Sequence, residues 1–386
     1  MNLEALYSHA LDDQPLSPEQ GLTLYQYAPT PVLMHIAHQL RCRRTSSSMV
    51  TWQIDRNVNI TNVCISGCKF CNFHCGANSQ RAFVTTMEQY RQKIDELLSY
   101  GGNQLLLQGG LHPKLGLKFY CDLFQQLKAY CPNLTLHALG PPEIAHIARM
   151  ERCSHRQVLE TLIKTGLDSL PGAGAEILVP EIRQQISPAK PCVEEWIEVM
   201  RVAHQFNMLT SATMMVGHVE TPAHRIEHLH RLRQLQAQRP ANAIGFMNFA
   251  LWTFQGQGTA LAKHPNYRPM QAEEYIRTVA ISRIMLHNIN NIQASWLTVG
   301  RQTAQICLHA GANDLGSIMI EENVVSSAGA QHRMDAFAIQ QTIAEAGFAP
   351  QLRNQRYQPI ELPPCPNSRI YARHELRLRA ATPIMP

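Results

Sequence analysis

Residues 58–76 read VNITNVCISGCKFCNFHCG and place Cys64, Cys68 and Cys71 in a C-x3-C-x2-C spacing. Three thiolates on one short loop can hold a metal centre, because thiolates bind both zinc and iron–sulfur clusters. A closed zinc site and a fully ligated iron–sulfur cluster both take a fourth ligand. Cys75 lies just beyond Cys71 and is the candidate for that position. The loop therefore predicts either a cluster with one open iron or a closed site completed by Cys75.

The rest of the sequence favours the open cluster. Zinc ribbons usually combine two C-x2-C pairs, and the sequence contains no second pair. The loop follows an apparent strand at 52–60 and carries Phe70 directly before its third cysteine. In these features it resembles the signature of the radical SAM superfamily. The resemblance implies a [4Fe-4S] cluster whose open iron binds S-adenosylmethionine, with Cys75 as a spectator, Phe70 near the adenine, and three ligands: Cys64, Cys68 and Cys71.

Composition indicates a cytoplasmic enzyme with a large core. The chain has 386 residues, of which 45% are hydrophobic and 16% charged. A net charge of +5 without blocks of like charge gives no reason to expect a nucleic-acid partner. The remaining cysteines form no disulfide pattern, and no signal peptide or membrane-length apolar run is visible. We therefore expect a reducing cytoplasm and no membrane partner.

The order of predicted elements indicates an α/β fold, a (β/α)8 TIM-type barrel with an N-terminal helical extension. The extension is predicted at 1–48, with a capping box beginning at Ser17 and a helix at 32–41. The barrel is predicted at 49–360 and a C-terminal tail at 361–386. Strands are predicted near 52–60, 103–108, 134–139, 167–171, 208–216, 243–254, 291–297 and 314–320. Helices are predicted at 87–100, 117–130, 156–165, 193–206, 222–238, 272–286 and 302–309.

Functional groups in such barrels gather at the carboxyl ends of the strands. After the second strand, Gln108 leads into Gly109 and Gly110, which the resemblance places against the methionine part of the cofactor. Glycine allows this close approach of the backbone. After the fourth strand, Glu176 is expected at the cofactor ribose or amine, and Arg183 at its carboxylate. Glu176 equally suits a helix start.

Four residues near strand ends are candidate catalytic bases. Each has an alternative role. The two glutamates suit the start of a helix, the histidine suits a buried ring with hydrogen-bond partners, and the aspartate suits hydrogen bonds to ribose hydroxyls. Sequence alone does not rank them, because their distances from the substrate are unknown. Asn248, Trp252 and Thr253 suit an aromatic substrate wall, and Asn248 equally suits a polar layer of the barrel interior. The candidate bases are Glu143, His218, Asp314 and Glu321.

Residues 291–330 resemble a particular radical SAM branch, the enzymes that build menaquinone through futalosine, including the dehypoxanthine futalosine cyclases. The sequences GAND at 311–314 and EENVV at 321–325 are similar to those of the cyclases. Residues 72–75 and 138–140 depart from the family pattern beside the expected site. The resemblance implies hydrogen abstraction from C4' of dehypoxanthine futalosine, ring closure onto its aromatic ring, and an electron donor such as flavodoxin or ferredoxin.

Two alternatives remain open at this point. The first is a sibling radical SAM enzyme that forms a carbon–carbon bond, namely aminofutalosine synthase or a deazaflavin synthase subunit. The second is a metal or electron-transfer protein without catalysis.

Overall fold

The computed structural model describes residues 2–361. The tail predicted at 361–386 lies outside the described residues except for Glu361. The division into extension, barrel and tail stays a prediction. No helix within the described range has both the length and the apolar character needed to cross a membrane.

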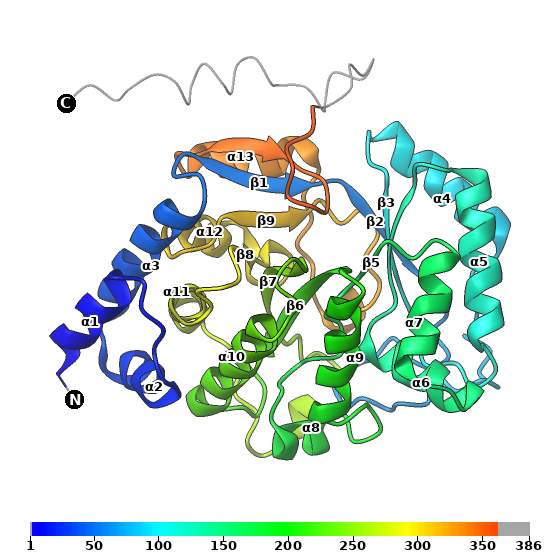
Figure 1. Cartoon of the computed structure of the whole chain (residues 1–386), viewed down its shortest axis with the longest axis horizontal. Helices are drawn as coiled ribbons and strands as arrows, with labels where there is room; N and C mark the ends of the chain where they lie inside the picture. Colours follow the sequence, from blue (N-terminus) through cyan, green and yellow to red (C-terminus); the bar gives the residue numbers. More distant parts are fainter. Residues whose placement is uncertain (1, 362–386) are drawn as a thin grey trace.

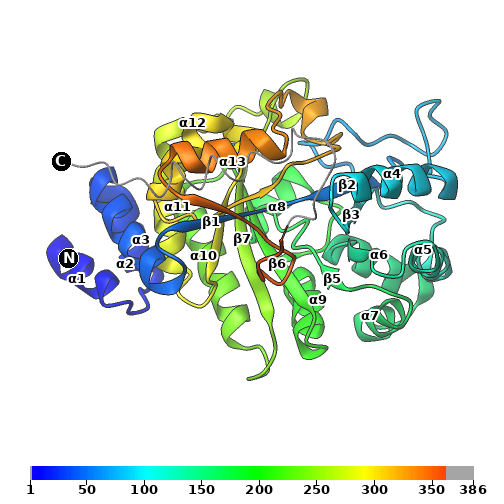
Figure 2. The same cartoon turned by 90° about the horizontal axis from the view of Figure 1, so that it is seen from above.

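Three helices precede the sheet: α1 (Leu3–Leu11), α2 (Pro18–Tyr27) and α3 (Thr30–Arg44). The predicted capping box is confirmed, because the Ser17 hydroxyl accepts from the Gln20 N–H while the Gln20 side chain accepts from the Ser17 N–H. Helix α3 packs against α11 (Ala272–Met285), and α2 packs against α10 (Pro222–Ala237) and α11. Helices α1 to α3 therefore lie on one side of the barrel, away from α4 (Met87–Ser99) and α5 (Leu117–Tyr130) (Figures 1 and 2).

All strand pairs in the sheet are parallel, as the alternation of strands and helices predicts. Every predicted strand is present. Strand β10, which follows the predicted set, was missed. The bounds are β1 Met49–Gln53, β2 Asp55–Asn59, β3 Gln104–Gln108, β4 Thr135–Ala138, β5 Ser169–Leu170, β6 Leu209–Val216, β7 Gly245–Thr253, β8 Asn291–Ala294, β9 Asp314–Ser317 and β10 Ala349–Leu352.

The sheet closes through its first strand. Its order is β10-β1-β9-β8-β7-β6-β5-β4-β3-β2, and only Ile54 separates β1 from β2 in the chain. β1 pairs with β9 and β2 pairs with β3, so the two short strands act as one bent barrel strand. Together with β3 to β9 they complete the predicted (β/α)8 barrel, and β10 extends the sheet beside β1.

The helices surround this sheet (Figure 2). The predicted helix at 302–309 is the second part of α12, which is broken at Gly300, where the backbone adopts φ 80° and ψ 170°. The sequence patterns missed α13, beside β10. The remaining bounds are α4 Met87–Ser99, α5 Leu117–Tyr130, α6 Pro141–Glu151, α7 His155–Lys164, α8 Pro180–Ile186, α9 Val193–Gln205, α12 Trp296–His309, α13 Ala336–Glu345, and the short 3-10 helices η1 Leu261–Lys263 and η2 Ser326–Ala328.

Alternation along the strands separates an apolar core from a polar interior. Side chains such as Val58, Leu105 and Leu107 belong to the buried hydrophobic core. Their neighbours Asn57 and Leu106 instead line a cavity inside the barrel. Because successive side chains of a strand point to opposite faces, one strand serves both the packing and the cavity.

Candidate active site

A cavity of about 400 Å³ occupies the barrel interior and reaches the carboxyl ends of the strands. Cys64, Cys68 and Cys71 all line it, on the loop that follows β2. The Ser66 hydroxyl lies 3.0 Å from Cys64 Sγ and 3.3 Å from Cys68 Sγ. The structure thus brings the three predicted ligands to the wall of one cavity at the barrel mouth.

Cys75 is separated from these three thiols. It is buried and does not line the cavity. Its backbone instead fixes the loop, since its N–H donates to Asn62 O and its carbonyl accepts from the Cys64 N–H. Across residues 2–361, no three His, Cys, Asp or Glu side chains form a group that could hold a single metal ion. Three thiols at the wall of one cavity fit the donor set of an iron–sulfur cluster.

The glycine turn after β3 lies against the cysteine loop. Gln108, Gly109 and Gly110 all line the cavity, as predicted for cofactor-binding residues. A Cβ on Gly110 would lie 2.2 Å from Val63 O and 2.8 Å from Cys64 Cβ. Glycine is therefore required here for the two loops to pack, in addition to any contact with a cofactor.

Close to the cysteine loop, Lys190 and Glu176 form an ion pair with 2.7 Å between Nζ and Oε1. Both line the cavity, and Lys190 Nζ also lies 5.1 Å from the centre of the Phe70 ring. Burial alone lowers the pKa of Lys190, but the neighbouring Cys68 and Glu176 raise it above its ordinary value overall. Sequence reasoning missed Lys190, which stands in a loop without a recognisable motif.

Glu176 has a positive φ of 44°, a conformation that is uncommon for a residue with a side chain. Such strain persists where the surroundings fix it and is common at functional sites. Arg183, predicted at the cofactor carboxylate, does not line the cavity. Its guanidinium donates to the carbonyls of Gly174, Ala175 and Pro191, so it holds together the loop that carries Glu176 and Lys190.

Glu143 is the one candidate base that lines the cavity. It lies in the first turn of α6 and is 6% exposed. Burial raises its pKa to about 7. A carboxyl group with this pKa can exchange protons near neutral pH.

The other three candidates do not line the cavity and have structural partners. His218 Nδ1 lies 3.3 Å from Glu220, and its Nε2 lies 3.1 Å from Met215 O. Asp314 accepts two hydrogen bonds from Arg353, at 2.6 and 2.9 Å. Glu321 lies 3.1 Å from Arg56 and also pairs with Lys93, and these ion pairs hold β2 and α4 to the loop after β9. Their catalytic roles stay predictions.

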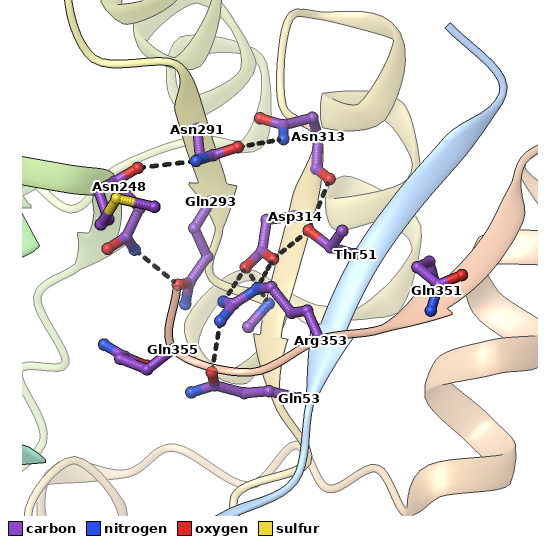
Figure 3. A network of polar contacts seen from close by, with 12 residues as sticks. Thr51, Gln53, Asn248, Asn291, Gln293, Asn313, Asp314, Gln351, Arg353 and Gln355 are labelled. Atoms are coloured by element: carbon purple, nitrogen blue, oxygen red, sulfur yellow. Dashed lines mark hydrogen bonds and ion pairs between the residues drawn. The ribbon is translucent and has the colours of Figure 1, made fainter. Parts of the chain in front are cut away.

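The sequence analysis also assigned no site role to several polar residues deeper in the barrel. Gln53, Asp55, Asn57 and Asn59 alternate along β1 and β2 and all line the cavity. The period-two spacing of these polar residues in the sequence is a signal that could have found them. Arg353, just after β10, enters the same space and donates to Gln53 (Figure 3).

Comparisons with known proteins agree with this geometry. Residues 58–232 match the radical SAM superfamily, and residues 243–365 match the CofH/MqnC C-terminal region. The chain is 38% identical over 360 residues to a cyclic dehypoxanthine futalosine synthase of Streptomyces coelicolor, covering 92% of this chain and 88% of that protein. The chain belongs to the radical SAM superfamily.

Other known proteins are similar along most of the chain. A cyclic dehypoxanthine futalosine synthase of Halalkalibacterium halodurans is 36% identical and covers 93% of this chain and 95% of its own length. A 5-amino-6-(D-ribitylamino)uracil–L-tyrosine 4-hydroxyphenyl transferase of Methanopyrus kandleri is 34% identical, covering 86% of this chain and 89% of that protein. The FeFe-hydrogenase maturase HydG of Carboxydothermus hydrogenoformans shares the fold, with a TM-score of 0.72 at 13% identity and coverage of 92% and 80%.

Radical SAM proteins use a [4Fe-4S] cluster and S-adenosylmethionine. The cavity fits both cofactors. Three thiols at its wall can hold a cluster, and the charged groups of Lys190 and Glu176 can meet the carboxylate and amine of the cofactor. The expected fold, enzyme class and cofactors are therefore confirmed.

Proposed function

We propose that this protein cyclises dehypoxanthine futalosine in menaquinone synthesis. The main support is that two relatives named cyclic dehypoxanthine futalosine synthase match almost the full chain, at 38% and 36% identity. The site supports the same reading, because one cavity joins the cysteine loop to a polar interior with room for a small molecule.

We assign the cluster to Cys64, Cys68 and Cys71. Phe70, the turn at 108–110 and Glu176 would hold S-adenosylmethionine, with Lys190 as a further binding group. When bound, the cluster and S-adenosylmethionine would supply the radical chemistry that removes a hydrogen atom from C4' of the substrate. The contribution of the chain is placement, because hydrogen transfer needs near contact of the reacting atoms. The enclosing barrel also keeps water and other reactants away.

We assign the removal of the final proton to Glu143. After ring closure, the aromatic carbon that forms the new bond must lose its hydrogen as a proton, and the ring must give up one electron, for which the oxidised cluster would be the acceptor. A carboxylate in the cavity wall with a pKa of about 7 is suited to accept that proton. His218, Asp314 and Glu321 are weaker candidates because they do not line the cavity.

The electron for cofactor cleavage would come from a reducing protein such as flavodoxin or ferredoxin. A cytoplasmic location suits this partner, because the scattered cysteines of the chain suggest a reducing compartment.

The test is an anaerobic turnover of reconstituted protein with dithionite, S-adenosylmethionine and dehypoxanthine futalosine, followed by mass spectrometry. A product lighter by two hydrogen atoms, formed with 5'-deoxyadenosine and absent in Cys64→Ala, supports the cyclase. The transferase relatives favour a second candidate, a sibling carbon–carbon bond-forming enzyme. Turnover of 5-amino-6-(D-ribitylamino)uracil with tyrosine, while dehypoxanthine futalosine stays intact, would replace the first proposal with the second.

A further inference from the structure

The first barrel strand presents a row of polar side chains to the cavity. Gln53, Asp55, Asn57 and Asn59 line it in succession from the amino end of the strand towards the cysteine loop. Barrel interiors of this class are usually filled by branched apolar side chains. Burying polar groups costs free energy unless they find hydrogen-bond partners. This row therefore needs an explanation beyond the packing of the barrel.

Two oxygen atoms in this row have no partner. Asp55 Oδ1 and Asn57 Oδ1 are buried and lack a hydrogen bond within the described part of the chain. The other carboxylate oxygen of Asp55 is satisfied, since it accepts from Gln53 at 2.9 Å. A buried acceptor without a donor is costly, and both residues line the cavity, so these oxygens suggest a ligand that donates hydrogen bonds to them.

Neighbouring strands add neutral amides to the same space. Asn248 on β7 donates to Gln293 on β8 at 3.3 Å, and both line the cavity (Figure 3). Gln355, after β10, lies 3.3 Å from His137 Nε2. We use the name amide wall for the carboxyl group of Asp55 together with the side-chain amides of Asn57, Asn248 and Gln293.

Charge around the amide wall is compensated. Arg353 is held by both oxygens of Asp314, so this guanidinium enters the cavity as part of a neutral pair. Burial lowers the pKa of His137 to about 3, which keeps the ring neutral, and burial raises the pKa of Asp55. The barrel mouth differs, because Lys190 and Glu176 carry charges there. The cavity thus has a charged end suited to a zwitterion and an interior suited to a neutral polar group.

We propose that the amide wall binds the vicinal hydroxyl groups of a neutral sugar-derived polyol on the substrate, with Asn57 as a specificity-determining residue. Hydroxyl groups supply both donors and acceptors, so they satisfy the unpaired oxygens and the amide groups together. The inference rests on the proposed function for the choice of substrate. The chemistry it requires, a run of hydroxyl groups, is shared by the ribose-derived part of dehypoxanthine futalosine and a ribityl chain.

The test measures binding without turnover. Reconstituted full-length protein with S-adenosylmethionine and no reductant is titrated calorimetrically with dehypoxanthine futalosine and its 2-deoxy and 3-deoxy sugar analogues. We expect the wild-type protein to bind at least one analogue with an affinity about 10-fold or more below its affinity for dehypoxanthine futalosine. The reason is that a lost hydroxyl leaves a buried acceptor unpaired. Asn57→Leu should bind dehypoxanthine futalosine about as weakly as the wild-type protein binds that analogue. The variant should also no longer discriminate between the parent compound and the analogue.

Two further variants make the test specific. Gln293→Met probes the opposite side of the amide wall, in case Asn57→Leu fails to fold. Leu106→Met is the matched control, because Leu106 pairs with Asn57 in register and lines the same cavity but has no polar group. It should preserve the discrimination between parent and analogues. Iron content and thermal unfolding show whether each variant is intact.

The outcomes separate the subsite from the proposed function. Equal binding of parent and both analogues by the wild type would overturn the subsite, even if turnover establishes the cyclase. If dehypoxanthine futalosine fails to bind, while 5-amino-6-(D-ribitylamino)uracil binds and Asn57→Leu weakens it about 10-fold, the subsite stands and the proposed substrate falls. Equal loss of discrimination in Leu106→Met would assign the effect to cavity shape and would also overturn the proposal.

Discussion

Lys190 Nζ and Glu176 Oε1 lie 2.7 Å apart in the wall of the cavity, with side chains only 14% and 6% exposed. Neither residue is near the cysteine motif in the sequence, yet the pair lies beside Phe70 of that motif. The barrel therefore places a fixed cation and a fixed anion where the cofactor is expected.

Replacing Lys190 by Met should lower the free energy of unfolding by about 3–5 kcal/mol, because it leaves Glu176 buried without its partner. Affinity for S-adenosylmethionine should fall as well. Urea unfolding and equilibrium binding measure the two effects. Lys164→Met is the control, since its pair with Glu160 is exposed and should matter little to stability. Unchanged cofactor affinity in Lys190→Met would remove this residue from the site.

Cys64→Ala should lose the cluster, whereas Cys75→Ala should keep it, because Cys75 supplies backbone contacts and does not line the cavity. Iron and sulfide analysis after anaerobic reconstitution, with the visible absorption spectrum, distinguishes the two variants. Loss of iron from both would restore the four-cysteine site as an explanation.

Gly110→Ala should prevent correct assembly of the cysteine loop. Its Cβ would lie 2.2 Å from a backbone oxygen, and such overpacking typically costs about 1–3 kcal/mol or more. The matched change is Gly76→Ala, where no atom lies within 4 Å of the new Cβ. We expect iron incorporation to fall only in the first variant, and equal iron in both would show that the loop accommodates the methyl group.

Product formation should depend on pH through Glu143. With a pKa of about 7, this carboxyl is largely protonated at pH 6 and cannot act as a base. The rate should therefore rise about tenfold per pH unit below 7 and level off above it. Glu143→Gln should abolish this dependence and slow product formation while 5'-deoxyadenosine still forms. An unchanged pH profile in the variant would place the base elsewhere.

Arg353→Met should destabilise the protein by about 3–5 kcal/mol, because Asp314 would remain as an unpaired buried charge. The double variant Asp314→Asn, Arg353→Met should be more stable than Arg353→Met alone, since it removes that charge. Urea unfolding measures both. If Asp314→Asn alone stops product formation without loss of stability, Asp314 acts in catalysis and its structural role is secondary.

The cofactor chemistry and the barrel could be predicted from the sequence. Cys64, Cys68 and Cys71 lie on one short loop, so their proximity follows from local spacing, and the alternation of apolar runs predicted each barrel strand. These features depend on neighbours in the chain. The four residues of β10 include Pro350, so this segment carries little strand signal. Helix α13 is as long as the predicted α7 and was overlooked.

Which of the strand-end residues face the cavity could not be predicted, because this depends on how the barrel closes. Glu143, His218, Asp314 and Glu321 look alike in sequence, since each follows or begins near a strand end. Asp314 accepts a hydrogen bond from Arg353, which lies 39 residues away in the sequence. Glu321 accepts one from Arg56, 265 residues away. Both carboxylates therefore have structural partners. Sequence periodicity does not reveal such distant partners. The direction of a side chain and the charge of its neighbours are set when the barrel closes, which is why Lys190 and the amide wall emerged from the structure.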